Sequence, residues 1–147
     1  MSEITNTSYS VPGFCANGIS AGIKEEGRRD LSLIYSKVPA KVAGVFTTNC
    51  FKAAPVLLDM KRVRSGAAQA IITNSGNANA ATGDEGYKDA VDIAKTTAGE
   101  LGIDEELVLV ASTGIIGHRL PVEKIMTGVK FLVSGLNEHG FMDAEEA

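Results

Sequence analysis

The second half of the sequence contains two apolar segments that each run directly into a glycine-rich turn, and this arrangement constrains the fold most. Residues 70–74 lead into an Asn- and Gly-rich turn at 74–83, and residues 107–111 lead into a second Gly-rich turn at 111–117. Short apolar runs bounded by such turns predict buried strands. Each turn is followed by a segment with helical periodicity, so the chain contains two strand–turn–helix units. We therefore predict an α/β protein, with an α+β mixed sheet and packed helices.

Two helices are predicted from apolar side chains at helical spacing. The first follows Thr82 and Glu85, which have the spacing of a capping box, and Gly102 is placed to end it. Its apolar face consists of Ala90, Ile93, Ala94, Thr97 and Leu101. The second helix begins near Pro121, because proline is tolerated in a first helical turn. Its apolar face consists of Val122, Ile125, Met126, Val129, Val133 and Leu136.

The first half of the chain is rich in strand signals. Residues 31–36 and, after Pro39, residues 42–48 have the β-branched and aromatic composition that predicts strands. Asn17 and Gly18 lie between apolar residues, and an Asn-Gly pair in that setting is typical of a hairpin turn.

The remaining segments predict connections and ends. Residues 24–30 read as a charged surface loop, and residues 55–59 form a third short apolar run. Residues 59–65 are charged and suit one or two helical turns. The polar, acidic tail at 137–147 is expected to be a solvated end, and residues 1–11 a loose N-terminal segment. With no repeat and no long linker, residues 12–147 are expected to form one domain.

The charge and hydropathy of the chain disfavour two classes of partner. The formal net charge is -4, and the basic residues form only short clusters at 28–29 and 61–64, whereas nucleic-acid binding needs a basic stripe. No apolar run approaches the roughly 20 residues that cross a bilayer. The N-terminus has neither the basic start nor the apolar stretch of a secretory signal. We therefore expect a cytoplasmic protein that contacts neither nucleic acid nor membrane.

The cysteines and histidines predict no metal site. Cys15 and Cys50 are too few and too far apart for a disulfide framework or a metal knuckle, and both are expected to be reduced, buried packing residues. His118 and His139 lack the spacing of metal ligands, so they are expected on surface loops.

The first candidate site is the Asn-rich turn, with Asn74, Asn77 and Asn79. A turn between a strand and a helix N-terminus can direct backbone N–H groups and amide side chains at an anion. The turn has neither the lysine of a phosphate loop nor the glycine spacing of a dinucleotide fingerprint. The alternative is a tight connection whose asparagines bond their own backbone, and the residues alone favour that structural role.

The second candidate is the turn at 111–117, which contains Thr113 and Gly114. A threonine hydroxyl beside an unobstructed glycine N–H provides two neighbouring donors, which is what an acyl-transfer site uses to bind a developing oxyanion. An ordinary turn with its hydroxyls bonded to nearby backbone is an equally good interpretation. Neither Ser112 nor Thr113 has a histidine or lysine close in sequence to act as a base, so the chain shows no complete nucleophile site.

Taken together and in order, these segments resemble the ornithine acetyltransferase family, also described as bifunctional glutamate N-acetyltransferases. Any one segment alone is a weak signal, whereas the ordered set covers the chain from about residue 10 onward and is very specific. The segments are Pro12-Gly13-Phe14, Gly22-Ile23-Lys24, Arg29-Asp30-Leu31, Ala43-Gly44-Val45-Phe46-Thr47-Thr48-Asn49, Lys52-Ala53-Ala54-Pro55-Val56, Asn74-Ser75-Gly76-Asn77-Ala78-Asn79-Ala80 and Val110-Ala111-Ser112-Thr113-Gly114-Ile115-Ile116-Gly117.

The resemblance implies a fold and an activity. The fold would be the N-terminal part of the ornithine acetyltransferase or aminopeptidase-like self-processing fold. Family members transfer acetyl from N-acetylornithine to glutamate in arginine biosynthesis, and some also use acetyl-CoA as donor; no other cofactor is implied. The precursor cuts itself into α and β chains, and the new N-terminal threonine of the β chain is the nucleophile. Mature enzymes are commonly cytoplasmic α2β2 heterotetramers.

The resemblance also assigns roles within this chain. The family's oxyanion hole lies in its Ser-Thr-Gly turn, which corresponds to Thr113 and Gly114. Family members often have Cys where this chain has Ala81, so that position is not needed for the core chemistry. The nucleophile and most substrate contacts lie beyond Ala147, so residues 12–147 would be the N-terminal part of an α chain, ending before the self-cleavage site and inactive alone. Two alternatives are a related self-processing aminopeptidase or amidase and a truncated, non-catalytic binding paralogue.

Overall fold

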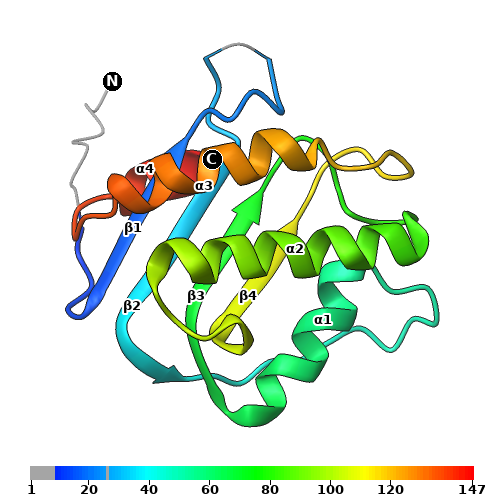
Figure 1. Cartoon of the computed structure of the whole chain (residues 1–147), viewed down its shortest axis with the longest axis horizontal. Helices are drawn as coiled ribbons and strands as arrows, with labels where there is room; N and C mark the ends of the chain where they lie inside the picture. Colours follow the sequence, from blue (N-terminus) through cyan, green and yellow to red (C-terminus); the bar gives the residue numbers. More distant parts are fainter. Residues whose placement is uncertain (1–8, 26) are drawn as a thin grey trace, which may run out of the picture.

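The computed structural model describes residues 9–25 and 27–147, which form one four-stranded mixed sheet with helices packed on it (Figure 1). The strands stand in sequence order; β1 to β3 are antiparallel, and β3 and β4 are parallel. This confirms the predicted fold class. The strands are β1 (Phe14–Ile19), β2 (Leu31–Lys41), β3 (Ala67–Asn74) and β4 (Val108–Ser112). The helices are α1 (Ala54–Arg62), α2 (Gly83–Leu101), α3 (Val122–Ser134) and α4 (Phe141–Glu146), with short 3-10 turns at Val63–Ser65 and Glu105–Leu107.

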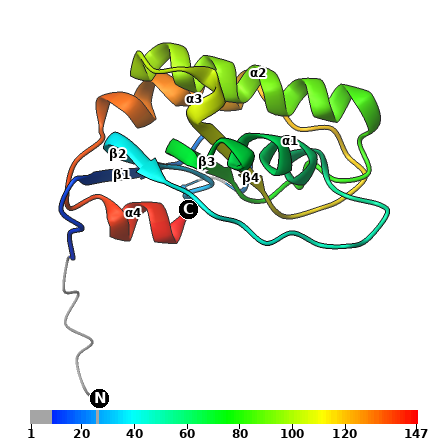
Figure 2. The same cartoon turned by 90° about the horizontal axis from the view of Figure 1, so that it is seen from below.

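The helices are distributed over both faces and one edge of the sheet. Figure 2 shows α2 and α3 above the sheet, α4 below it, and α1 beside β4. The main core lies between the sheet and the pair α2 and α3. Its most deeply buried apolar side chains come from β2, β3, β4 and α3, namely Leu31, Leu33, Ile72, Val108, Ile125, Val129 and Leu132.

The two strand–turn–helix units lie side by side, because α2 connects β3 to its parallel neighbour β4. In the register of that pair, Asn74 at the end of β3 is opposite Ser112 at the end of β4. Parallel strands whose ends are level release their following loops at one edge of the sheet. The two glycine-rich turns therefore meet, although 38 positions separate Asn74 from Ser112 in the chain.

The free edge of β4 is satisfied by side chains of α1 instead of by another strand. Asp59 Oδ1 accepts a hydrogen bond from the Val110 N–H at 3.1 Å, and Arg62 Nη1 donates to the Val108 carbonyl at 2.6 Å. Exposed strand edges are liable to pair with other chains, so this contact protects β4. Burial raises the pKa of Asp59 from its ordinary value of 3.8 to about 6, against the opposing effects of the Val110 N–H and of Arg62.

The helical predictions are largely confirmed. α2 ends at Gly102, whose φ of 69° is the left-handed conformation that favours glycine, and α3 begins directly after Pro121. Thr82 precedes α2 as predicted, but its side chain does not cap the helix; its hydroxyl donates to Asn79 Oδ1 instead. Residues 59–65 are helical as expected, and the apolar run at 55–59 is also part of α1.

The predicted hairpin turn at Asn17 and Gly18 is wrong, because both residues lie inside β1. The Asn17 amide donates to the main-chain carbonyls of α3 at Phe131 and Leu132, so its polarity is used in the interior. A Cβ on Gly18 would lie 1.9 Å from the Asp143 carbonyl oxygen, so the glycine permits close approach of α4 and does not form a turn.

The strand predicted at 42–48 is also wrong. β2 extends to Lys41, and residues 42–49 have no regular structure. Strand propensity is expressed only where a segment packs and pairs with a neighbouring strand. Val45 is fully exposed, and within the described residues no strand pairs with this segment.

The acidic tail is only in part the solvated end that its composition suggests, since the side chains of Asp143 and Glu146 are 42% and 68% exposed but the segment is ordered. Residues 141–146 form α4, in which Phe141 is buried, and Arg29 pairs with Asp143 and Glu146. The described residues of the predicted loop, 24, 25 and 27–30, belong to no helix or strand, as expected, but Asp30 is buried and accepts hydrogen bonds from main-chain N–H groups at 2.6 to 2.9 Å.

The expectation for residues 1–11 falls mostly outside the described residues, and positions 9–11 are exposed.

Within the described chain, none of the helices combines the length and apolar character needed to cross a bilayer.

Candidate active site

The two glycine-rich turns are joined by main-chain hydrogen bonds that extend the parallel pairing beyond β3 and β4. Thr113 N–H donates to the Asn74 carbonyl at 3.0 Å, and Ile115 N–H donates to the Gly76 carbonyl at 3.2 Å. In return the Ala78 N–H donates to the Ile115 carbonyl at 2.9 Å. Both turns are thus held as one unit, which fixes the backbone around Thr113 and Gly114.

Gly114 sits at the closest approach of the two turns. Its φ is 133°, and an added Cβ would lie 2.3 Å from the carbonyl carbon of Gly76 and 2.5 Å from the Asn77 nitrogen. Only glycine fits this backbone and this space. The Gly114 N–H has no hydrogen-bond partner within residues 9–25 and 27–147, and neither has the Thr113 hydroxyl.

Thr113 and Gly114 are both exposed at the surface where the turns meet. Two neighbouring donors without internal partners, on a backbone held by fixed hydrogen bonds, can stabilise negative charge that develops on an incoming oxygen. The geometry therefore favours the oxyanion interpretation of this turn over the ordinary turn.

The three asparagines of the other turn use their amide groups as donors to main-chain carbonyls. Asn74 and Asn79 are buried; Asn74 Nδ2 donates to the Asn77 carbonyl at 2.8 Å, and Asn79 Nδ2 donates to the Gly86 carbonyl at 2.7 Å. Asn77 is half-buried, and its amide reaches the His118 carbonyl at 3.1 Å. These contacts favour the structural role of the turn.

Ser112 links the end of β4 to the Asn-rich turn. Its hydroxyl accepts from the Asn79 N–H at 2.9 Å and donates to the Asn77 carbonyl at 3.1 Å. Because the Ser112 hydroxyl both donates and accepts a hydrogen bond, it has a structural role and is not a free nucleophile.

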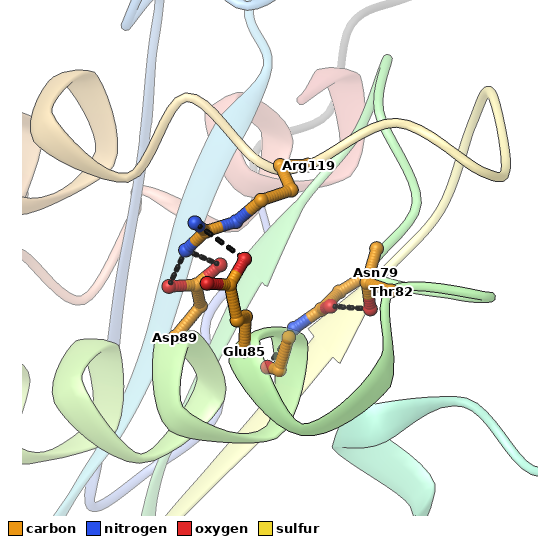
Figure 3. Close-up of polar contacts among 6 residues, drawn as sticks. Asn79, Thr82, Glu85, Asp89 and Arg119 are labelled. Carbon is orange, nitrogen blue, oxygen red and sulfur yellow. Dashed lines mark hydrogen bonds and ion pairs between the residues drawn. The ribbon is translucent and has the colours of Figure 1, made fainter.

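A cluster that the sequence patterns did not single out holds the segment that follows the Ser-Thr-Gly turn (Figure 3). Arg119 Nη2 lies 2.7 and 3.0 Å from the two carboxylate oxygens of Asp89, and Nη1 lies 2.9 Å from Glu85 Oε2. The hydrogen bond and charge of Asp89 raise the pKa of the Arg119 guanidinium. The i, i+4 spacing of Glu85 and Asp89 on α2 is visible in the sequence, whereas their shared partner on a distant loop is not.

The two histidines and the two cysteines differ in exposure, and His118 contacts the Asn-rich turn through its carbonyl, which accepts from Asn77. His118 and His139 are both exposed, as expected. Cys15 is half-buried, but Cys50 is exposed, so the expectation that it packs in the interior is wrong. It lies in the irregular segment before α1, where no element covers it. Within the described ranges no group of His, Cys, Asp and Glu side chains is arranged to hold a metal ion.

Comparison with known proteins gives consistent matches. Residues 15–147 match the ArgJ family. The chain is 51% identical over 146 residues to the arginine biosynthesis bifunctional protein ArgJ of Caldanaerobacter subterraneus, covering 99% of this chain and 36% of that protein. It is 53% identical over 127 residues to the protein of the same name from Geobacter sulfurreducens, covering 86% and 32%. The chain thus spans about a third of the length of these relatives.

Two solved structures share the fold. One is an ornithine acetyltransferase from Mycobacterium tuberculosis, complexed with ornithine, with a TM-score of 0.89 at 40% identity. The match covers 92% of this chain and 75% of that one. The other is the arginine biosynthesis bifunctional protein ArgJ of Bacillus halodurans, with a TM-score of 0.86 at 37% identity, covering 95% and 75%. The resemblance drawn from the ordered motifs is confirmed by these matches, and the chain belongs to the ArgJ family.

Proposed function

We propose that this chain is the α-chain portion of an acetyltransferase that moves acetyl from N-acetylornithine to glutamate in arginine biosynthesis. The observation that carries the proposal is the pair of unpartnered donors, the Thr113 hydroxyl and the Gly114 N–H, on a backbone fixed by the neighbouring turn. Family membership supports the same reaction class, since the relatives are arginine biosynthesis proteins and a matched structure is an ornithine acetyltransferase.

In the proposed reaction, a threonine hydroxyl of the β chain attacks the acetyl carbonyl carbon of N-acetylornithine, with the threonine's own amine accepting the proton. The carbonyl oxygen becomes an oxyanion, which accepts hydrogen bonds from Thr113 and Gly114. The C–N bond breaks, and ornithine leaves after its nitrogen takes up the proton. The amine of glutamate then attacks the acetyl-threonine ester, and the same two donors bind the second oxyanion. When this oxyanion collapses, the ester C–O bond breaks, the threonine oxygen takes up the proton that the glutamate amine loses, and N-acetylglutamate leaves. Thr113 and Gly114 are thus catalytic residues, while Asn74, Asn77 and Asn79 hold them in place.

The division of the enzyme into two chains is part of the proposal. This chain covers 75% of the matched ornithine acetyltransferase chain but only 36% of the curated relative, so that solved chain is less than half as long as the relative. A relative cut into two chains would have this property. We propose that residues 12–147 belong to the α chain, that the precursor cleaves itself beyond them, and that the β chain completes a cytoplasmic α2β2 assembly.

No cofactor is needed for this chemistry, because both steps transfer the acetyl group between oxygen and nitrogen nucleophiles. The relatives are described as bifunctional. We propose acetyl-CoA as a second acetyl donor for the same site, with its thioester carbonyl placed against the same two donors.

The test is reconstitution with the remainder of the longer polypeptide, followed by incubation with N-acetylornithine and glutamate. We expect N-acetylglutamate and ornithine to form in equal amounts, and the isolated chain to form neither. Release of free acetate in place of N-acetylglutamate would support the aminopeptidase or amidase alternative, and a reconstituted complex without turnover would support the non-catalytic paralogue.

A further inference from the structure

The first two turns of α2 contact both glycine-rich turns. On the Asn-rich side, the Gly86 carbonyl accepts a hydrogen bond from Asn79 Nδ2 at 2.7 Å. A Cβ on Gly86 would lie 1.9 Å from the Thr82 hydroxyl oxygen and 2.5 Å from Asn79 Oδ1, so this close approach requires glycine. Three residues further along α2, Asp89 binds Arg119, which follows the Ser-Thr-Gly turn (Figure 3). Because residues three apart on a helix are neighbours, one face of α2 supports both turns.

The segment that carries the two oxyanion donors, residues 113–119, is here called the oxyanion loop. Its first part is tied to the Asn-rich turn, since every second N–H from Thr113 to Gly117 donates to a carbonyl of that turn at 3.0 to 3.2 Å. His118 and Arg119 form no hydrogen bond between main-chain groups within the described residues. The last part of the loop is therefore held by side chains, namely Arg119 and an amide of the Asn-rich turn that bonds the His118 carbonyl at 3.1 Å.

The ion pair of Arg119 has one buried partner. The Asp89 side chain is 8% exposed, and its two oxygens lie 2.7 and 3.0 Å from Arg119 Nη2. Glu85, one turn earlier on α2, lies 2.9 Å from Nη1. A buried carboxylate is costly without its cation, so release of Arg119 from α2 would cost stability. This cost fixes the end of the oxyanion loop against the helix.

We propose that Arg119 and Asp89 are positioning residues for acetyl transfer, because their ion pair fixes the loop that carries Thr113 and Gly114. The inference rests on the proposed function for the role of these two donors. Arg119 forms its side-chain contacts with α2 and with neither donor, so it acts through the loop backbone. Oxyanion donors are effective only when they are held in place, and a displacement of about 1 Å can cost ~100-fold in rate.

The first experiment examines the loop without substrate. Amide hydrogen exchange is measured by NMR in the wild-type chain and in Arg119→Met, which removes the ion pair. We expect the Ile115 and Gly117 N–H groups to exchange ~10-fold faster or more in the variant, because the loop opens more often, while the core strands keep their rates. The control is Lys37→Met, which removes the exposed ion pair with Glu138 on a part of β2 distant from the turns and should change neither amide. Unchanged exchange in Arg119→Met would overturn the inference.

The second experiment separates positioning from stability. Arg119→Met leaves a buried charge, whereas the double variant Arg119→Met, Asp89→Asn removes both charges, so its Tm should recover toward that of the wild type. Both are assayed in the reconstituted enzyme well below their Tm. We expect kcat to be ~10-fold lower in both, with KM for N-acetylornithine within about twofold of the wild type. Arg119→Lys keeps the cation, so its kcat should lie between those of Arg119→Met and the wild type.

The outcomes distinguish the two proposals. A double variant that regains both Tm and kcat would overturn the inference, because the ion pair would then act on stability alone. Wild-type kcat in Arg119→Met would overturn it as well. A wild-type enzyme that transfers no acetyl group would refute the proposed function, and the exchange rates of Ile115 and Gly117 would still decide whether the ion pair fixes the loop.

Discussion

The two glycine-rich turns follow similar buried strands but differ in the hydrogen bonding of their polar groups. Each follows a buried strand, each is rich in small residues, and the two are hydrogen-bonded to each other. In the Asn-rich turn the amide donors are bonded to protein carbonyls, whereas in the Ser-Thr-Gly turn the Thr113 hydroxyl and the Gly114 N–H have no partner within the described ranges. One turn is therefore a support and the other offers unused donors. Chemistry is expected where polar groups are held rigidly without internal partners, and not where polar residues are most numerous.

Removing the Thr113 hydroxyl is expected to have the largest effect on acetyl transfer. Thr113→Val keeps the shape of the side chain, so the free energy of unfolding should change little, while kcat in the reconstituted enzyme should fall ~100-fold or more, as for loss of one oxyanion donor. Thr113→Ser is the control, since it retains the hydroxyl and should keep most of the activity. A Val variant as active as the Ser variant would remove Thr113 from the proposed mechanism.

The matching change in the Asn-rich turn should act on stability. Asn79→Ala removes a buried amide that bonds the Gly86 carbonyl and the Thr82 hydroxyl, so we expect the free energy of unfolding to fall by about 2–3 kcal/mol. Urea denaturation measures this loss. The comparison between the turns would fail if Asn79→Ala were fully stable and reduced only the rate of acetyl transfer.

The Arg119 cluster links the segment after the Ser-Thr-Gly turn to α2. Arg119→Met leaves the buried carboxylate of Asp89 without its cation, so we expect a decrease in Tm of a few degrees, which shrinks as salt is added. Arg119→Lys keeps the charge but loses the bidentate contact with Asp89, so its Tm should lie between those of the Met variant and the wild type. An unchanged Tm for Arg119→Met at low salt would show that the main-chain bonds alone hold this segment.

The smallest expected effect concerns α1, which supports the strand that carries the Ser-Thr-Gly turn. Because the folded-state pKa of Asp59 is raised from 3.8 to about 6, its contribution to stability is complete below pH 3.8 and is lost as the pH rises through 6. Asp59→Asn keeps an oxygen for the Val110 N–H but cannot ionise. We expect it to be more stable than the wild type by about 1 kcal/mol at pH 8, after allowance for partial exposure, and not at pH 4. The difference in unfolding free energy, measured across this range, tests the assignment; a constant difference would contradict it.

Local patterns were reliable where a single element decides the conformation. The periodicity from Ala90 to Leu101 predicted α2, and Gly102 ends it, because helical spacing and a left-handed residue act within one segment. Strand propensity gave a wrong prediction at residues 42–48, because a strand also needs a neighbouring strand to pair with. The turn signal at Asn17 and Gly18 was wrong because the glycine there permits close packing and does not form a turn. The site was predictable in part. Thr113 and Gly114 could be named from their motif, but the hydrogen-bond partners of the polar groups around them could not.

By itself the sequence determined the family, the mixed α/β class and the two strand–turn–helix units, because ordered motifs, apolar periodicity and glycine positions are local properties of the chain. Only the tertiary structure decided which donors remain unused, which helix covers the edge of β4 and which side chains of α2 hold the oxyanion loop. The reason is physical. Whether a polar group is satisfied or an apolar side chain is covered depends on atoms supplied by distant segments, such as Asp59 for Val110 or Arg119 for Asp89, and sequence spacing does not specify those contacts.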